Sequence, residues 1–169
     1  MPLIVKDEPQ EFPLCPDGLH SAVLVDAVDL GQQESKFGTK HKLSLVFETQ
    51  LQDEEGKPFI LVKRYTWSLH EKSNLRIDLE RFRGHKLEAS ELKEGVDIES
   101  YIGMSCQILV THNETEDRVY ANIESVLPYK DASGKVAYFA ITSSGNYQRV
   151  IDRDSYLQPE EFAMAKNGV

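Results

Sequence analysis

Lys57–Gly84 reads KPFILVKRYTWSLHEKSNLRIDLERFRG, and this stretch decides the fold. From Phe59 to Leu69, apolar and aromatic residues recur mostly at alternate positions, which is the pattern of a strand with one buried face. After Ser73, the apolar residues recur at helical spacing instead. Ser73 is a suitable N-cap, and Gly84 stands where a helix C-cap glycine belongs. The stretch therefore predicts a long strand that leads into a single helix.

Strands on either side of this stretch complete the predicted architecture. Their apolar patterns cover residues 19–30, 43–48, 104–111 and 119–127. The resulting order is three strands, one helix and two strands, which is the order of a five-stranded oligonucleotide/oligosaccharide-binding (OB) barrel. We therefore predict a mainly β fold, with an OB-type Greek-key barrel and the helix between its third and fourth strands. A split sheet with one helix packed across it is the alternative, because it would give much the same pattern.

The predicted OB-like barrel occupies residues 19–128, between two less regular segments. Residues 1–18 hold four prolines and are expected to form an irregular lead-in. Residues 31–42 contain two glycines, and we interpret them as a long hairpin loop between the first two strands. Residues 129–169 form a C-terminal extension, in which 136–142 has the pattern of a further strand and 159–166 that of a short helix.

The composition is that of a globular protein, with 40% hydrophobic and 28% charged residues in a chain of 169. No apolar run approaches the roughly 20 residues that cross a bilayer, and the N-terminus lacks a secretory pattern. Cys15 and Cys106 lie far apart without a motif around them, which indicates reduced thiols and a cytoplasmic location. The five histidines show no metal-ligand spacing, so we expect neither a metal nor a cofactor.

Charge is distributed unevenly along the chain. The net charge is −9, which argues against a uniformly basic surface that coats duplex DNA. Residues 57–86 nevertheless hold eight basic and three acidic residues. Because salt screens surface charges over roughly 8–10 Å, a local basic groove can attract a polyanion even within an acidic protein.

Four segments carry a resemblance to a known family: GLHSAVLVDAVDLGQQESKFGTKHKLSLVFET, YTWSLHEKSNLRIDLERFRG, DIESYIGMSCQILVTH and YANIESVLP. Over about residues 18–128, the chain resembles small phage- and prophage-encoded proteins that are similar to single-stranded DNA-binding OB proteins. The resemblance implies binding of single-stranded DNA in phage-type replication or recombination, with replication or recombination proteins as further partners. The chain ends in AMAKNGV, unlike the acidic, aromatic-tipped tails of bacterial single-strand binders.

Binding of a single strand requires cations for the phosphates and flat rings for the unstacked bases. In OB folds, these groups lie on strands 2 and 3 and on the loops that flank them. The candidate nucleic-acid-binding residues come from the first loop, the third strand and the fifth strand: Lys36, Phe37, Lys40, Lys42, Lys63, Arg64, Tyr65, Trp67, Arg118 and Tyr120.

Strand parity complicates the assignment within the third strand. Lys63, Tyr65 and Trp67 share the parity of the inward-pointing apolar residues, unless a β-bulge reverses the phase. Core and stacking roles are therefore both open for the two aromatic residues, and the core is favoured for Trp67. Phe37 has no apolar strand beside it, so it is the better candidate for a stacking platform. Tyr120 has outward parity, which favours exposure.

Other functional classes have less support in the sequence. No Walker, GxSxG or CxxC sequence is present, and Ser90-x-x-Lys93 lies in a polar turn without a glycine-rich oxyanion loop, so we expect no enzyme activity. The main alternative is a non-catalytic protein-interaction module of a phage or prophage system, built on the same barrel. The acidic segments 48–55 and 113–117 favour it. The run at 136–142 could also serve as an interface strand in a homo-oligomer.

Overall fold

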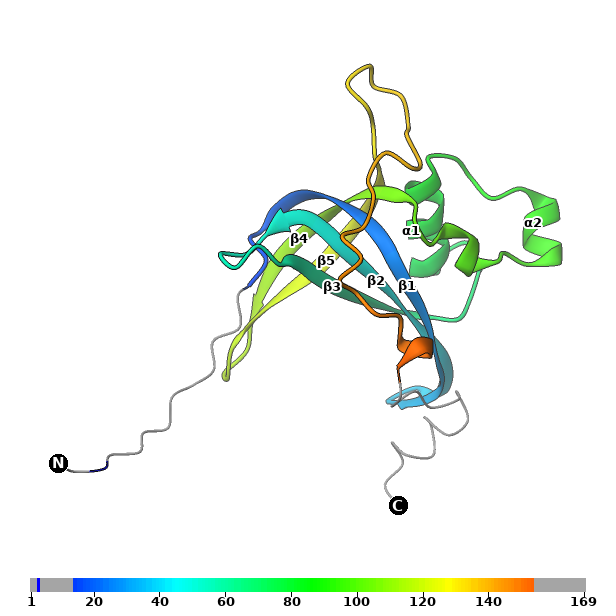
Figure 1. Cartoon of the computed structure of the whole chain (residues 1–169). Helices are drawn as coiled ribbons and strands as arrows, with labels where there is room; N and C mark the ends of the chain where they lie inside the picture. Colours follow the sequence, from blue (N-terminus) through cyan, green and yellow to red (C-terminus); the bar gives the residue numbers. More distant parts are fainter. Residues whose placement is uncertain (1–2, 4–13, 154–169) are drawn as a thin grey trace.

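The computed structural model describes Leu3 and residues 14–153, which form a mainly β fold (Figure 1). The strands are β1 (Gly18–Ser35), β2 (Gly38–Gln52), β3 (Pro58–Thr66), β4 (Ser105–Glu114) and β5 (Val119–Pro128). The helices are α1 (Asn74–Arg83) and α2 (Ala89–Glu94), with the short 3-10 turns η1 (Ile98–Tyr101) and η2 (Val150–Asp152). The strands and α1 follow one another along the chain in the predicted order, and α2 is a second, short helix.

All five strands belong to one antiparallel sheet, in the order β3-β2-β1-β4-β5. The edge strands are β3 and β5, and the sheet curves until these two strands approach each other. Lys63 on β3 reaches across, and its ammonium lies 3.4 Å from the carbonyl oxygen of Glu124 on β5. The described strands form no backbone ladder between β3 and β5, so backbone hydrogen bonds do not close the sheet into the predicted barrel.

The main core consists of the side chains on one face of the sheet and on one face of α1. On β2, Leu43, Leu45 and Phe47 are buried in this core and alternate with residues that point to the other side of the sheet. Helix α1 adds the buried apolar side chains Leu75, Leu79 and Phe82. Burying each of these larger side chains stabilises the fold by about 1.5–3 kcal/mol. The helix contacts both β3 and β5, so it covers the interior side of the gap between the edge strands.

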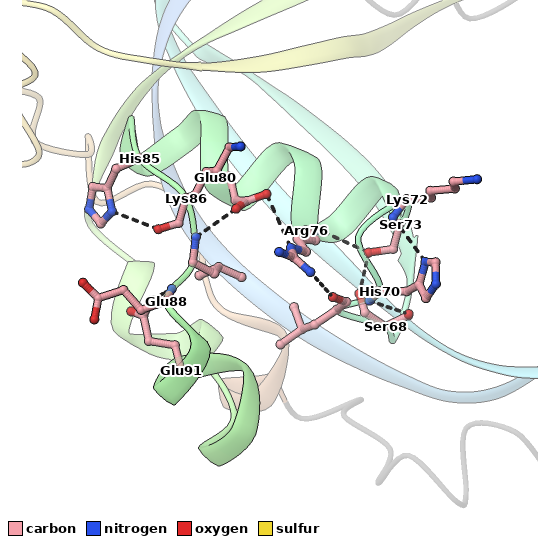
Figure 2. A network of polar contacts seen from close by, with 12 residues as sticks. Ser68, His70, Lys72, Ser73, Arg76, Glu80, His85, Lys86, Glu88 and Glu91 are labelled. Atoms are coloured by element: carbon pink, nitrogen blue, oxygen red, sulfur yellow. Dashed lines mark hydrogen bonds and ion pairs between the residues drawn. The ribbon is translucent and has the colours of Figure 1, made fainter.

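The caps predicted for α1 are confirmed. The Ser73 hydroxyl accepts a hydrogen bond from the Arg76 N–H, and Gly84 adopts the left-handed conformation with a φ of 79°. Figure 2 shows the polar network around this helix, in which Arg76 reaches back to the preceding loop. Its guanidinium donates to the Leu69 carbonyl at 3.3 Å and lies 3.5 Å from the Glu80 carboxylate. These contacts fix the direction in which β3 leads into α1.

The predicted loop at 31–42 is wrong, because β1 and β2 continue as a paired ribbon to a two-residue turn. Ser35 pairs with Gly38, which has a φ of 101°, and only Lys36 and Phe37 lie between them. This part of the ribbon is largely polar on both sides. Backbone pairing alone therefore forms it, without the apolar alternation by which a strand is recognised in a sequence.

The predicted strand at 136–142 is also wrong. Residues 129–153, called the strap below, first project from the sheet as a loop, in which Lys130 pairs with Val136, and then cross its outer face without joining it (Figure 1). The strap backbone is held by isolated contacts, such as the 2.8 Å hydrogen bond from the Ile141 N–H to the Ser105 hydroxyl, and not by a strand ladder. The predicted helix at 159–166 lies outside the described residues.

Apolar packing and two buried carboxylates fasten the strap to β1 and β2. Ile141, Tyr129 and Tyr147 pack against Val23, Val25 and Val46. Asp26 on β1 is fully buried and accepts hydrogen bonds at 2.9–3.0 Å from the Tyr147 hydroxyl, the Arg149 guanidinium and the Val150 N–H. Burial, together with the bond to Asp26, raises the pKa of Tyr147 to about 12. Glu48 on β2 accepts from the N–H and the hydroxyl of Ser144 at 2.7 and 3.0 Å.

Candidate nucleic-acid interface

The β2–β3 pair carries cations on its outer face, at the end where β2 begins and β3 ends. Lys42 on β2 and Arg64 on β3 each stand next to a buried core residue of their own strand, so both point outward. Lys42 is paired with Thr66, two positions from Arg64, which makes the two cations diagonal neighbours on one face. Lys40 has the same parity as Lys42 and extends the row of cations toward the hairpin tip.

Two rings stack on the opposite side of the same strand ends. The backbone N–H of Trp67 donates to the His41 carbonyl at 2.8 Å, which extends the β2–β3 pairing by one residue. The indole and imidazole centroids are 4.1 Å apart, and the ring planes differ by 9°. His41 Nε2 lies 2.6 Å from the Asp29 carboxylate, which orients the imidazole. Trp67 is 50% exposed, so its indole keeps open surface beyond the face that His41 covers.

The turn of the β1–β2 hairpin adds a further aromatic ring. Phe37 is 85% exposed, and the Lys40 ammonium lies 5.9 Å from its ring centroid, which is a cation–π contact. Lys36 precedes Phe37 and is exposed as well. Glu34 is the one acidic residue of segment 31–42, which also holds three lysines. The hairpin is therefore a locally basic part of an acidic protein.

Together these residues form what we call the β2–β3 site, defined as Lys36, Phe37, Lys40, His41, Lys42, Arg64 and Trp67. None of its lysine or arginine side chains forms an ion pair with any residue that the structure describes. Their charges are therefore not neutralised from within this part of the molecule. The site offers cations on one side of two strand ends and stacked rings on the other side.

Lys63 and Tyr65, which were predicted to bind nucleic acid, lie elsewhere. Tyr65 is 2% exposed, and its hydroxyl donates to the Asp78 carboxylate on α1 at 2.7 Å. The Lys63 ammonium lies 2.6 Å from the same carboxylate. Burial, followed in size by the adjacent Asp78 charge, raises the pKa of Tyr65. Both side chains follow the inward parity of β3, so they join this strand to α1. Tyr65 offers no surface to a ligand, and the Lys63 ammonium is already paired with Asp78.

Arg118 and Tyr120 lie on a different hairpin from the β2–β3 site. The Arg118 guanidinium sits 4.6 Å from the Tyr120 ring centroid, and the tyrosine is 38% exposed, as its outward parity predicts. Figure 1 shows the β4–β5 turn and the β1–β2 turn on opposite sides of the molecule, at the lower left and lower right. The structure therefore brings six of the ten predicted residues together at the β2–β3 site, and it leaves this pair, like Lys63 and Tyr65, apart from them.

His41 is the site residue that sequence reasoning missed. Its signal was its parity: it alternates with Leu43 on β2, which places it on the interior side of the sheet. Parity was also the reason to expect Trp67 in the core. That parity is right, but the core ends one pair earlier, at Leu43 and Tyr65, so His41 and Trp67 stack on each other outside it.

Among the described residues, no three histidine, cysteine, aspartate or glutamate side chains gather in a way that could hold a metal ion. No helix in the described ranges has both the length and the apolar character needed to span a membrane. In comparisons with known proteins, no family model matches this chain, and no curated protein sequence matches it.

Proposed function

We propose that this protein is a single-stranded DNA-binding protein of phage-type replication or recombination, and that it binds the strand at the β2–β3 site of an OB-type fold. The strand order β3-β2-β1-β4-β5, with α1 between β3 and β4 in the chain, supports the OB assignment. The observation that carries the function is the pairing of unneutralised cations with an open, stacked indole on the same two strand ends.

The two sides of the site suit the two sides of a single strand. Phosphates would follow Lys40, Lys42 and Arg64 on the outer side, where each contact releases counterions. Unstacked bases would turn over the edge of β3 toward Trp67, and each stacked base contributes roughly 1–3 kcal/mol. In a duplex, the bases are already paired and stacked, so the rings would find no free base face. The arrangement therefore favours a single strand over a duplex.

The net charge of −9 is compatible with this proposal because the carboxylates on the outer face of β1 and β2 are covered. Asp26 and Glu48 both lie on the outer face, and the strap buries and hydrogen-bonds both of them. The outer surface that is left open on β2 and β3 contains the unpaired cations. A phosphate backbone would therefore meet positive charge there in an otherwise acidic protein.

Fluorescence anisotropy tests the proposal with a short labelled oligothymidylate and a duplex of the same length, at about 50 and 200 mM salt. We expect tighter binding of the single strand and a marked loss of affinity at the higher salt. Equal affinity for the two forms, or no saturable binding at the lower salt, would exclude this function. That result would favour the alternative of a protein-interaction module built on the same fold.

A further inference from the structure

A shallow cleft of about 430 Å³ lies beside the C-terminal end of α1, separate from the β2–β3 site. Its apolar floor comes from Ile77 on α1 and Pro128 at the end of β5, and its cationic rim comes from Arg81 and Lys86. Glu80 is the acidic residue of the lining, but its carboxylate is occupied by the Leu87 N–H at 2.8 Å and by the guanidinium of Arg76. The cleft is therefore positive and partly apolar.

The basic residues around α1 fall into two groups. Arg76 and Arg83 are paired with Glu80 and Glu91 and belong to the structure of the helix. Arg81 and Lys86 are exposed and form no ion pair within the described ranges, and Arg81 makes only a 3.4 Å contact to the hydroxyl of Ser125. Two cations are thus left unneutralised around an apolar floor. This combination suits an acidic peptide segment that carries an apolar side chain.

The β4–β5 turn of the same chain has this chemistry: it is acidic, and its one cation, Arg118, lies over the Tyr120 ring. The side chains of Glu114, Glu116 and Asp117 are exposed and make no ion pair or hydrogen bond that the described structure shows, and the neighbouring Val119 is 40% exposed. The other acidic turn, between β2 and β3, differs. There, Asp53 accepts hydrogen bonds from the N–H groups of its own turn and Glu55 pairs with Lys57, so Glu54 is the one carboxylate of this turn without a partner in the described structure.

The two complementary surfaces cannot meet within one molecule, because α1 and the β4–β5 turn lie on opposite sides of it (Figure 1). A contact between them must join two copies through different surfaces, and such a heterologous contact extends as an open row unless its rotation closes a ring. We propose that the β4–β5 turn of one copy docks in the α1 cleft of the next copy. Copies would then bind in a row along one DNA strand. This inference rests on the proposed function.

Exposed charge pairs are weak on their own, so the contact should become visible where a strand holds copies side by side at high effective concentration. The measurement is the ratio of apparent affinities for a long and a short oligothymidylate, with cooperativity fitted on the long one. Affinity for the short strand reports the β2–β3 site alone. Using the ratio also removes any general effect of the changed net charge.

Charge reversal provides the test. We expect R81E/K86E and E116K/D117K each to lower the long-to-short ratio at least about five-fold, with short-strand affinity nearly unchanged for the first variant. The quadruple variant R81E/K86E/E116K/D117K restores opposite charges across the contact and should recover the ratio. The matched control K130E/K135E changes two exposed strap lysines outside the cleft and should leave the ratio unaltered.

Two results would overturn the inference: unchanged ratios in both double variants, or a quadruple variant that fails to recover while its short-strand affinity and thermal stability match those of the parent. If the parent protein does not bind even the short strand, the proposed function itself fails. If short-strand binding is retained and the ratio is insensitive to these residues, only the proposed row of copies is excluded.

Discussion

Strand β2 carries two sets of ionisable side chains on the same outer face, and the fold treats them differently. Glu48 lies under the strap, is 4% exposed and accepts two hydrogen bonds from Ser144. Lys40 and Lys42, closer to the hairpin tip, have no ionic partner in the described chain. Where the strap covers the sheet, every described carboxylate on this face is bonded. Where the sheet is open, the cations are left unpaired.

The difference separates stability from binding. A buried charge must be compensated, because leaving it unpaired costs several kcal/mol, so the carboxylates under the strap are part of the framework. An exposed cation costs little when unpaired and keeps its charge for a ligand. We therefore expect changes under the strap to alter folding and changes at the β2–β3 site to alter binding.

The largest effect is expected from Asp26→Ala. It leaves the Tyr147 hydroxyl, the Arg149 guanidinium and the Val150 N–H without their shared acceptor. Removing one partner from a buried pair destabilises by about 3–5 kcal/mol. Urea denaturation should show this as a lower midpoint, while Asp17→Ala, at an exposed position, should stay near the parent. A midpoint for Asp26→Ala within error of the parent would mean that the strap contributes nothing to the fold.

The next effect is on binding, in the variant K40A/K42A/R64A. Each lost phosphate contact flattens the dependence of log affinity on log salt by about 0.7 for a single strand, so three contacts reduce the slope by about 2. The free energy of unfolding should change little because these side chains form no ion pairs. The control K93A/K130A/K135A removes the same charge from exposed positions elsewhere. Equal slopes in the two variants would show that net charge, and not the β2–β3 site, attracts the strand.

A smaller effect is expected from Trp67→Ala. Loss of one stacking platform should weaken binding by about 1–3 kcal/mol at every salt concentration, with the salt slope unchanged. Phe139→Ala is the matched control, since Phe139 is 73% exposed but lies on the strap. Quenching of indole fluorescence on titration with oligothymidylate provides a second readout in the parent protein. If Phe139→Ala weakens binding as much as Trp67→Ala does, stacking at this position is not the cause.

The smallest effect is a change in how the stability of the fold depends on pH, and it reports on the strap. Burial and the bond to Asp26 raise the pKa of Tyr147 from its ordinary value near 10 to about 12. Because the folded state holds this proton more tightly, its contribution to stability is complete below about pH 10 and is lost as the pH rises toward 12. Tyr147→Phe should lose about 1 kcal/mol at neutral pH and show a flatter decline over this window.

Urea midpoints across that alkaline range measure the effect, and Tyr120→Phe, at an exposed tyrosine of the β4–β5 hairpin, serves as the control. Other groups whose pKa is raised by burial, such as Tyr65, contribute to the decline in every variant. The informative quantity is therefore the difference in slope from the parent. Parallel curves for Tyr147→Phe and the parent would contradict a Tyr147–Asp26 contact in solution.

Much of the framework could be predicted from short-range patterns. The two caps of α1 and the inward parity of Lys63 and Tyr65 follow from local spacing, and the structure has them where parity puts them. The polar ribbon at the end of β1 and β2 could not be predicted, since it has no apolar alternation. The strap could not be predicted either, because an apolar run such as 136–142 looks the same whether it pairs with a strand or lies across one.

The sequence by itself determined the order of the strands and of α1 along the chain, the ends of that helix and the side of each strand that faces the core, because these depend on neighbours a few residues apart. Tertiary structure decided which charges are neutralised. Asp26 finds its partners more than a hundred positions away on the strap, while Lys42 and Arg64 find none among the described residues. Pairing of charges depends on distance in space, and local sequence patterns do not contain that distance.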